Sequence, residues 1–585
     1  MPTGATLADA ERPPIRLAHA RDERICNDAR MLRRSARDAA EPGPARAPAL
    51  APRTGSPWAP LRNKVFRALI IAQVASNVGT MMHNVGAAWL MGDLDPSPSL
   101  VALVQTATML PVFLVGVPAG ALADIVDRRI LLITTQLAML ASALALAALS
   151  FTDHVTEVSL LALTFALGLG SAFNQPAWQA IQPELVDRSE LPQALALGNT
   201  TFNVGRAIGP AIGGLVVARA GAAWVFVLNA GSFLAVVAVL VRWRHRPTPS
   251  VIPVETMAGA MRAGLRYGTY SNALRHVLVR SAAFVVPGTA LVSLLPVVAR
   301  GPLGMGSGGY GVLLGCFGLG AALSAVVRPR IVARIPVDRL MFVASVVVAA
   351  GLLVTGLSGN AVLIGLSLLF VGASWTLAIT ATGVAAQMAL PNWVRARGMG
   401  LWNLAITGGI AIGSVIWGVL ASWRLGGAHV IAAVSMLVLF VLTTRWKLST
   451  PDRLDVELTA ASDLVLSLEP EPDDGPVLVT IRYAVPDDQL AAFLQEMRRV
   501  ERQRRRTGAY RWGLFRDLED PSVILETYLV ETWAEHVRQH HRVTNSDRAV
   551  LGAAYQFVLG EMQVRHWVSC YTAERAPNGR PDQGL

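Results

Sequence analysis

The sequence predicts an all-α polytopic membrane protein with two six-helix halves, followed by a small C-terminal α+β domain. Of its 585 residues, 53% are hydrophobic and 16% are charged, a balance that is unusual for a soluble protein of this length. Apolar stretches of membrane-spanning length recur between Phe66 and Trp446, and the loops between them alternate in charge. After Trp446 the sequence becomes polar and the pattern of elements changes.

Twelve spans are expected, because a helix needs about 20 apolar residues to cross the hydrocarbon core. The first set lies at about 65–91, 99–122, 130–151, 157–177, 195–218 and 222–242, and the second at about 279–299, 308–327, 338–356, 361–385, 398–421 and 427–445. A basic linker with an expected surface helix over Met257 to Tyr267 separates the two sets. Two six-helix sets joined in this way are a repeat architecture of secondary transporters.

Arginines gather in alternate loops, as at Arg128 with Arg129 and at Arg395 with Arg397. The opposite loops are short and carry few charges, such as Asp93 and Arg300. The positive-inside rule therefore predicts that both termini are cytoplasmic, in a bacterial inner membrane. The net charge of +11 fits such arginine-rich loops and is weak evidence for nucleic-acid binding.

The expected domain organisation follows these changes in composition. It comprises a disordered N-terminus (1–60), a first half (61–245), a cytoplasmic linker (246–278), a second half (279–446), a second linker (447–475), a soluble domain (476–573) and a disordered tail (574–585). Within the soluble domain, strand and helix patterns alternate in the order β-α-β-β-α-β, with the last strand expected over Val564 to Tyr571. This order predicts a ferredoxin-like or α+β-barrel domain.

The loop after the second span carries Gly120, Asp124, Arg128 and Arg129. This spacing resembles the loop motif of the major facilitator superfamily, although Ile125 and Asp127 depart from it. The resemblance implies a major facilitator fold and a cytoplasmic gate in which the carboxylate and the arginines take part. The alternative is a simple charge cluster that sets the topology.

The fifth span carries Gly205, Gly209, Pro210, Gly213 and Gly214. Glycines four residues apart form one smooth helix face, which lets another backbone approach closely, and the proline is expected to bend the helix. The segment resembles the fifth-helix motif of facilitator antiporters, which implies export. The alternative is helix packing without any directional meaning.

A wider resemblance covers nearly all of the chain after Pro60. Pro176 to Trp178, Pro183 to Val186 and Asn203 to Pro210 are similar to the facilitator branch that contains the enterobactin exporter. Gly508 to Gly513 and Trp533 to His540 resemble the C-terminal extensions found in that branch, which are similar to the α+β barrels of antibiotic-biosynthesis monooxygenases. The resemblance implies a permease with an appended domain.

Polar side chains form stripes on several spans. The candidates to line a substrate cavity are Asn77, Asn84, Asn203, Arg206 and Asn403. Polar groups in a membrane interior are costly, so they are expected to face the bundle interior or a wet cavity. Hydrogen bonding between helices is the alternative. For Arg206, contact with an anionic substrate and contact with a structural partner stay open.

The spans contain no Asp or Glu away from their ends. Proton coupling is therefore implied by the family resemblance alone, and His83 and Asp124 are the candidates to carry it. For His83 the alternative is a hydrogen-bonded packing residue.

In the soluble domain, His536 and His540 have a spacing that can bind a metal on a helix. The segment lacks the glutamate of zinc proteases, so a charged, solvated helix face is favoured, and no metal, cofactor or catalytic residue is predicted. The chain has no Gly-Lys-Ser/Thr phosphate loop, which argues against transport driven by ATP.

These observations predict a secondary active transporter that works by alternating access. The family resemblance implies that it exports a small organic molecule (a drug, a siderophore or a secondary metabolite), with protons as the coupling ion. The expected partners are that small molecule and the lipid bilayer, with self-association through the C-terminal domain and no nucleic acid. The alternative is a membrane-anchored sensor or enzyme whose C-terminal domain carries the activity.

Overall fold

The computed structural model describes residue 56 and residues 58–187, 189–243, 257–332, 335–391, 393–448 and 470–569. Most of the segments 1–60 and 574–585, which were expected to be disordered, lies outside these residues, as does most of the 447–475 linker. The side chain of Asp124 is also outside the described part, although its backbone belongs to a helix.

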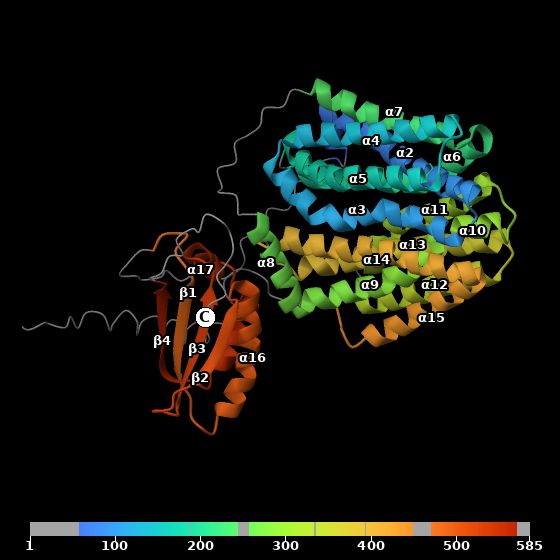
Figure 1. Ribbon diagram of the computed structural model, residues 1–585. Helices are drawn as coiled ribbons and strands as arrows, with labels where there is room; N and C mark the ends of the chain where they lie inside the picture. Colours follow the sequence, from blue (N-terminus) through green and yellow to red (C-terminus); the bar gives the residue numbers. More distant parts are fainter. Residues whose placement is uncertain are drawn as a thin grey trace, which may run out of the picture. The chain divides into compact units, whose positions relative to one another are not determined.

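Within the described residues, twelve helices are long and apolar enough to cross a membrane, in agreement with the predicted number. The first half contains α2 (Lys64–Leu94), α3 (Pro98–Ile125), α4 (Arg128–Phe151), α5 (Glu157–Leu185), α6 (Leu191–Ala220) and α7 (Ala222–Arg242), preceded by the short η1 (Ala59–Arg62). The second half contains α9 (Asn272–Ser293), α10 (Leu295–Arg300), α11 (Ser307–Val332), α12 (Val337–Leu357), α13 (Ala361–Met388), α14 (Arg395–Trp423) and α15 (Leu425–Thr443). Between them lies α8 (Met257–Tyr270), and the long helices run alongside one another (Figure 1).

Side chains at the helix starts explain several of these boundaries. Asp127, which stands where the facilitator motif usually has glycine, caps α4 by accepting hydrogen bonds from the backbone N–H groups of Arg129 (2.8 Å) and Ile130 (3.2 Å). Ser271 caps α9 in the same way. Because of this cap α9 begins at Asn272, earlier than the predicted start of the seventh span at about 279.

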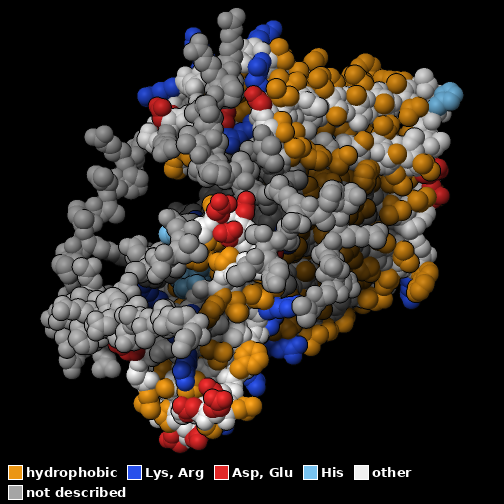
Figure 2. Space-filling view, turned by 60° about the vertical axis from the view of Figure 1, so that its left-hand side comes forward, with side chains coloured by type: hydrophobic (Ala, Val, Ile, Leu, Met, Phe, Trp, Pro, Cys, Tyr) orange, Lys and Arg blue, Asp and Glu red, His pale blue; other side chains and the backbone are white. Residues whose placement is uncertain are grey.

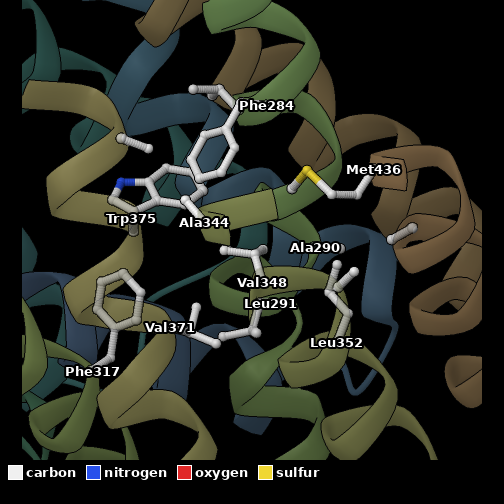
Figure 3. Packing of buried hydrophobic residues seen from close by; sticks show 14 of the residues in the cluster. Phe284, Ala290, Leu291, Phe317, Ala344, Val348, Leu352, Val371, Trp375 and Met436 are labelled. Carbon is white, nitrogen blue, oxygen red and sulfur yellow. The ribbon is translucent and has the colours of Figure 1, made fainter. Parts of the chain in front are cut away.

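Buried apolar side chains of the long helices α9 and α11 to α15 form the core of the second half. Figure 3 shows Phe284 of α9 and Trp375 of α13 with their rings in contact, with Val348 of α12 and Met436 of α15 close by. The ring centroids of Phe284 and Trp375 lie 5.4 Å apart. Such interlocking contacts hold membrane helices together, because lipid tails are as apolar as the side chains and provide no hydrophobic driving force between helices.

Many large apolar side chains of the spans point outward, as expected where helices meet lipid. Leu234, Phe370 and Val441 are more than half exposed. In Figure 2 hydrophobic side chains cover the visible face of the bundle, and charged side chains gather toward its two ends. This distribution fits a protein that spans a bilayer.

The C-terminal domain contains β1 (Val477–Ala484), α16 (Leu490–Thr507), β2 (Arg511–Arg516), β3 (Val523–Val530), α17 (Trp533–His540), α18 (Asn545–Tyr555) and β4 (Leu559–Val568). Its antiparallel sheet has the order β2-β3-β1-β4, which is the ferredoxin-like order that the sequence predicted. Alternate residues of β1, namely Val477, Val479, Ile481 and Tyr483, are buried in the core of the domain.

The last strand differs from its prediction. It begins at Leu559 and ends at Val568, whereas the sequence favoured Val564 to Tyr571. Its first half lacks a clear apolar alternation, and Gly560 adopts a left-handed backbone with φ of 73°. The register with β1 shifts at a bulge between Arg482 and Ala484, so the pattern of side chains there does not reveal a strand.

Candidate functional site

The two six-helix halves meet along two helix pairs, α6 with α11 and α3 with α14. A Cβ on Gly214 would lie 2.7 Å from the Cα of Gly311, and a Cβ on Gly318 would lie 2.1 Å from the carbonyl oxygen of Arg206. The hydroxyl of Thr106 donates to the carbonyl of Ala411 across the other pair (3.1 Å). Small residues thus bring the backbones of the two halves into contact.

One end of the bundle is clamped by Arg300, the last residue of α10. Its guanidinium donates to the carboxylate of Asp93 (2.7 Å) and to the carbonyls of Gly92 (2.8 Å) and Trp89 (3.1 Å) in the first half. It also lies over the ring of Trp89, 4.3 Å from the centroid, and Trp89 stacks on Tyr310. We call this the Asp93 end of the bundle, and these contacts hold it closed.

We call the opposite end the Arg128 end. Toward this end of α3, a Cβ added to Gly116 or Gly120 would meet no atom of another described element within 4 Å. Arg128 pairs with Glu184 of α5, and Arg129 donates to the carbonyls of Leu240 (2.8 Å) and Val241 (3.0 Å) at the end of α7. Within the described residues, both arginines therefore bind their own half and do not bridge to the second one in this structure.

The glycine face of α6 packs against α2. A Cβ on Gly205 would lie 2.8 Å from the backbone of Asn77, on Gly209 2.6 Å from the Cβ of Met81, and on Gly213 2.8 Å from the Cα of Met82. Pro210, which is also part of the motif, is buried within the helix, and a Cβ on Gly311 of α11 would lie 2.7 Å from the carbonyl oxygen of Pro210. Gly214 meets the same residue of the second half. Gly205, Gly209 and Gly213 thus hold two helices of one half together, while Pro210 and Gly214 contribute to the contact between the halves.

The predicted cavity residues fall into two groups. Asn77 is a link between helices: its side-chain N–H donates to Thr201 of α6 (3.0 Å), and its oxygen accepts from Gln73 (3.2 Å). Asn84, Asn203 and Asn403 are half-buried, and their side chains make no hydrogen bond to any described residue. No hydrogen bond among the described residues joins these three amides to one another.

Arg206 belongs to the second group. It is half-buried, and its guanidinium lies over the ring of Phe317 on α11, 5.3 Å from the centroid, so it faces the second half. No carboxylate among the described residues pairs with it. Asn203 lies one helical turn away on the same side of α6. A cation and an amide therefore face the boundary between the halves, without partners in the part of the chain that the structure describes.

His83 lies elsewhere. It is buried, its ring packs against Phe226 of α7 at 4.8 Å, and neither ring nitrogen has a hydrogen-bond partner among the described residues. The residue therefore sits inside the packing of the first half, away from the boundary that Arg206 faces.

In the C-terminal domain the predicted solvated helix face is wrong for His536. That residue is fully buried, and its ring contacts His540 and also His566 of β4, each at 4.8 Å between centroids. Burial lowers the pKa of His536 to about 3, with His540 and His566 adding to the effect, and burial lowers the pKa of His540 to about 4. No sequence pattern links His566 to this pair, because only the fold brings β4 beside α17.

Charged residues connect this domain with α8. Arg266 pairs with Glu535 (3.0 Å), and Arg262 pairs with Glu531 (2.9 Å). Glu535 is also bound by Arg542 and Arg538. Burial would raise the pKa of the Glu535 carboxyl, but these arginines hold it below its usual value. The linker helix and the domain therefore share one ionic network.

The described residues form twelve candidate spans in two halves that meet along close contacts of small residues, an architecture typical of membrane transporters. The comparisons agree. The profile of the transmembrane secretion effectors, a branch of the major facilitator superfamily, matches residues 55–576, and the chain belongs to this family.

Characterised relatives are transporters as well. The chain is 24% identical to the staphyloferrin A transporter of Staphylococcus aureus over 279 residues, which are 47% of this chain and 70% of that protein. It is 26% identical to the enterobactin exporter of Escherichia coli O1:K1 over 401 residues, 66% of this chain and 94% of that one. The multidrug efflux pump Tap of Mycolicibacterium fortuitum matches at 27% over 220 residues, which are 36% of this chain and 54% of the pump.

Solved structures show the same fold at low identity. The nucleoside transporter NupG superposes with a TM-score of 0.56 at 11% identity, covering 65% of this chain and 99% of that one. A bacterial homologue of the iron transporter ferroportin superposes with a TM-score of 0.54 at 15% identity, covering 66% and 98%. These matches support the fold and carry no information about the substrate.

Proposed function

We propose that this chain is a secondary active exporter of a small, anionic organic molecule. The observation that carries the proposal is Arg206, a cation that faces the boundary between the halves and has no carboxylate partner among the described residues. An arginine at membrane depth is costly and is retained where it binds something. A guanidinium suits carboxylates and phosphates, which it binds with two parallel hydrogen bonds.

The half-buried amides indicate that the substrate also carries polar groups besides its negative charge. Asn84, Asn203 and Asn403 each offer a donor and an acceptor that no described residue uses. Two of the characterised relatives are named for the siderophores staphyloferrin A and enterobactin, and a third is a drug efflux pump. A siderophore-like metabolite with acidic groups fits both the relatives and Arg206.

The transport cycle follows from the two ends of the bundle. If arginine-rich loops are cytoplasmic, the Arg128 end faces the cytoplasm and the Asp93 end faces outward. The closed Arg300 clamp and the open space beside Gly116 and Gly120 then correspond to a state that accepts substrate from the cytoplasm. Export requires the clamp to release and Asp124, Arg128 and Arg129 to bridge the halves at the other end.

Proton coupling and self-association complete the proposal. Asp124, which lies at the end of its span, and His83 are the candidates for a coupled proton, since the spans hold no acid away from their ends. On the sheet face that α16 and α17 leave uncovered, Phe515 and Trp567 are about half exposed. A second copy of the domain would cover such an apolar face.

Everted membrane vesicles test the transport proposal. Vesicles with an imposed inside-acid gradient should accumulate anionic members of a panel that includes the two siderophores, together with neutral and cationic compounds. Arg206→Ala should lower this uptake about tenfold or more, because a hydrogen bond to a charged group is lost. Arg219→Ala, an exposed arginine on the same helix, is the control and should transport normally.

Two results would contradict the proposal. One is an absence of gradient-dependent flux for the whole panel in vesicles that contain folded protein. The other is an Arg206→Ala variant that transports anionic compounds as fast as the wild type.

A further inference from the structure

Three histidines converge in the C-terminal domain. His536 and His540 lie one turn apart on α17, and His566 lies on β4. One ligand nitrogen from each of the three lies within 4.8 Å of the others. His536 is fully buried, whereas His540 and His566 are half-buried, so the cluster is reachable from solvent on one side.

The sheet register explains why His566 joins the pair. His566 is opposite Val479, and Val479 is one of the β1 residues that are buried beneath the helices. Side chains opposite each other on neighbouring strands point to the same face, so the imidazole of His566 is on the helix side of the sheet. Trp533 packs against His536 (5.3 Å between centroids) and His566 (6.2 Å) and fixes both rings.

Two of the three histidines already have the spacing of ligands on one metal ion, and the third lies close enough to join them after a small movement of its ring. The Nε2 atoms of His536 and His540 lie 3.2 Å apart. Two imidazole nitrogens bound to one tetrahedral Zn²⁺, each at about 2.0–2.1 Å, stand roughly 3.3 Å apart. A single N–H···N hydrogen bond could explain this pair but leaves the third imidazole unexplained. The buried Nδ1 of His536 has no partner among the described residues, and neither has the buried Oε1 of Gln539 one turn on.

The charges nearby do not oppose a cation. Arg504 is an arginine that acts on both His536 and His540. Its guanidinium is paired with the buried carboxylate of Glu526, which accepts from Nε of Arg504 at 3.1 Å.

We propose that His536, His540 and His566 form a three-imidazole site for a divalent transition-metal ion such as Zn²⁺. Water or an external ligand would occupy the fourth position, on the side where His540 and His566 reach solvent. A metal there links α17 to β4, which is an edge strand of the sheet, and so stabilises the fold of the domain. An open fourth position also leaves room for an acidic group of a transported molecule or of another protein.

Metal titration of the full chain tests the site. The protein would be purified in detergent with an affinity tag that contains no histidine, treated with a chelator, and titrated with Co²⁺ and then Zn²⁺. We expect one Co²⁺ per chain, with the strong visible absorption of a low-coordinate site, displaced by one Zn²⁺. Zn²⁺ should also raise the melting temperature of the domain, since it binds the folded state.

The variants His540→Ala and His566→Ala should each weaken the metal affinity at least tenfold, since even the loss of an outer-shell partner costs about 10–100-fold. Both side chains are half-buried, so these variants are expected to fold, unlike a change at the buried His536. His541→Ala, an exposed neighbour, is the matched control and should bind like the wild type. Stoichiometric binding that survives in both variants, or no saturable binding by the folded wild type, would overturn the proposal.

Discussion

Arg300 of the second half donates a hydrogen bond to Asp93 of the first half, with 2.7 Å between the guanidinium nitrogen and the carboxylate oxygen. The ion pair itself is partly exposed and is worth about 0–1 kcal/mol. The same guanidinium also donates to two backbone carbonyls and lies over the ring of Trp89. Arg300 thus binds the end of α2 through several contacts. This residue therefore favours closure of the Asp93 end.

Replacing Arg300 with Ala should shift the protein toward the state that is open at the Asp93 end. The loss of charged hydrogen bonds predicts a change of about 1.5–3 kcal/mol in that equilibrium. Spin labels at Thr152 and Gly359, which lie in loops of the two halves at this end, would report the distance between the halves. Arg300→Lys keeps the charge and should give an intermediate shift. A distance distribution unchanged by Arg300→Ala would show that the clamp does not set this equilibrium.

The fold could be predicted from the sequence because both of its parts obey strong local patterns. Hydropathy and loop charge defined the spans, and alternation defined strands such as Val477–Ala484. The misplaced boundaries, at Asn272 and Leu559, depend on a serine cap and on a bulge against β1. The cap and the bulge each depend on a few local backbone hydrogen bonds, and a hydropathy pattern carries no information about them.

The site was harder to predict because it depends on which residues meet. Asp93 and Arg300 were visible as rare charges in short loops, yet nothing in the sequence paired them. The polar stripe of span one contained both Asn77, which binds Thr201, and Asn84, which binds no described residue. Periodicity places both on one helix face and cannot tell a structural amide from a free one.

The glycine face of α6 predicts a sharp packing effect. In Gly209→Leu the side chain would push against Met81 and the carbonyl of Val78, which a Cβ would approach to 2.6 and 3.0 Å. Overpacking of this kind costs about 1–3 kcal/mol, so the melting temperature in detergent should fall. Gly231→Ala on α7, where a Cβ meets no atom within 4 Å, is the matched control. Equal melting temperatures for Gly209→Leu and the wild type would mean that the two helices can separate without cost.

The two amides of span one should respond differently to truncation. Asn77→Ala removes the hydrogen bond to Thr201, and such bonds between membrane helices contribute about 0.6 kcal/mol on average. It should lower thermal stability and leave transport largely intact. Asn84→Ala should leave stability unchanged and lower transport, if this amide contacts substrate. Melting curves and vesicle uptake, measured on both variants, distinguish a structural role from substrate contact. If Asn77→Ala lowered transport and Asn84→Ala lowered stability, the two assignments would be reversed.

A buried carboxylate in the C-terminal domain predicts the largest loss of stability. Glu526 is fully buried and accepts hydrogen bonds from Tyr483 (2.6 Å), Trp512 (2.8 Å) and Arg504 (3.1 Å). Glu526→Ala leaves the Arg504 guanidinium, itself 13% exposed, without its counter-charge. Removing one partner of a buried ion pair costs about 3–5 kcal/mol.

Limited proteolysis of the full chain would measure this loss, as faster cleavage within the domain. Glu501→Ala breaks a pair with Arg505 that is about one-third exposed, so it should change the cleavage rate little. Cleavage of Glu526→Ala at the wild-type rate would show that water or a rearranged side chain compensates Arg504. The hydrogen-bond partners of Glu526 given above all belong to the C-terminal domain. Substrate uptake by the Glu526→Ala variant would therefore also show whether transport needs a folded C-terminal domain.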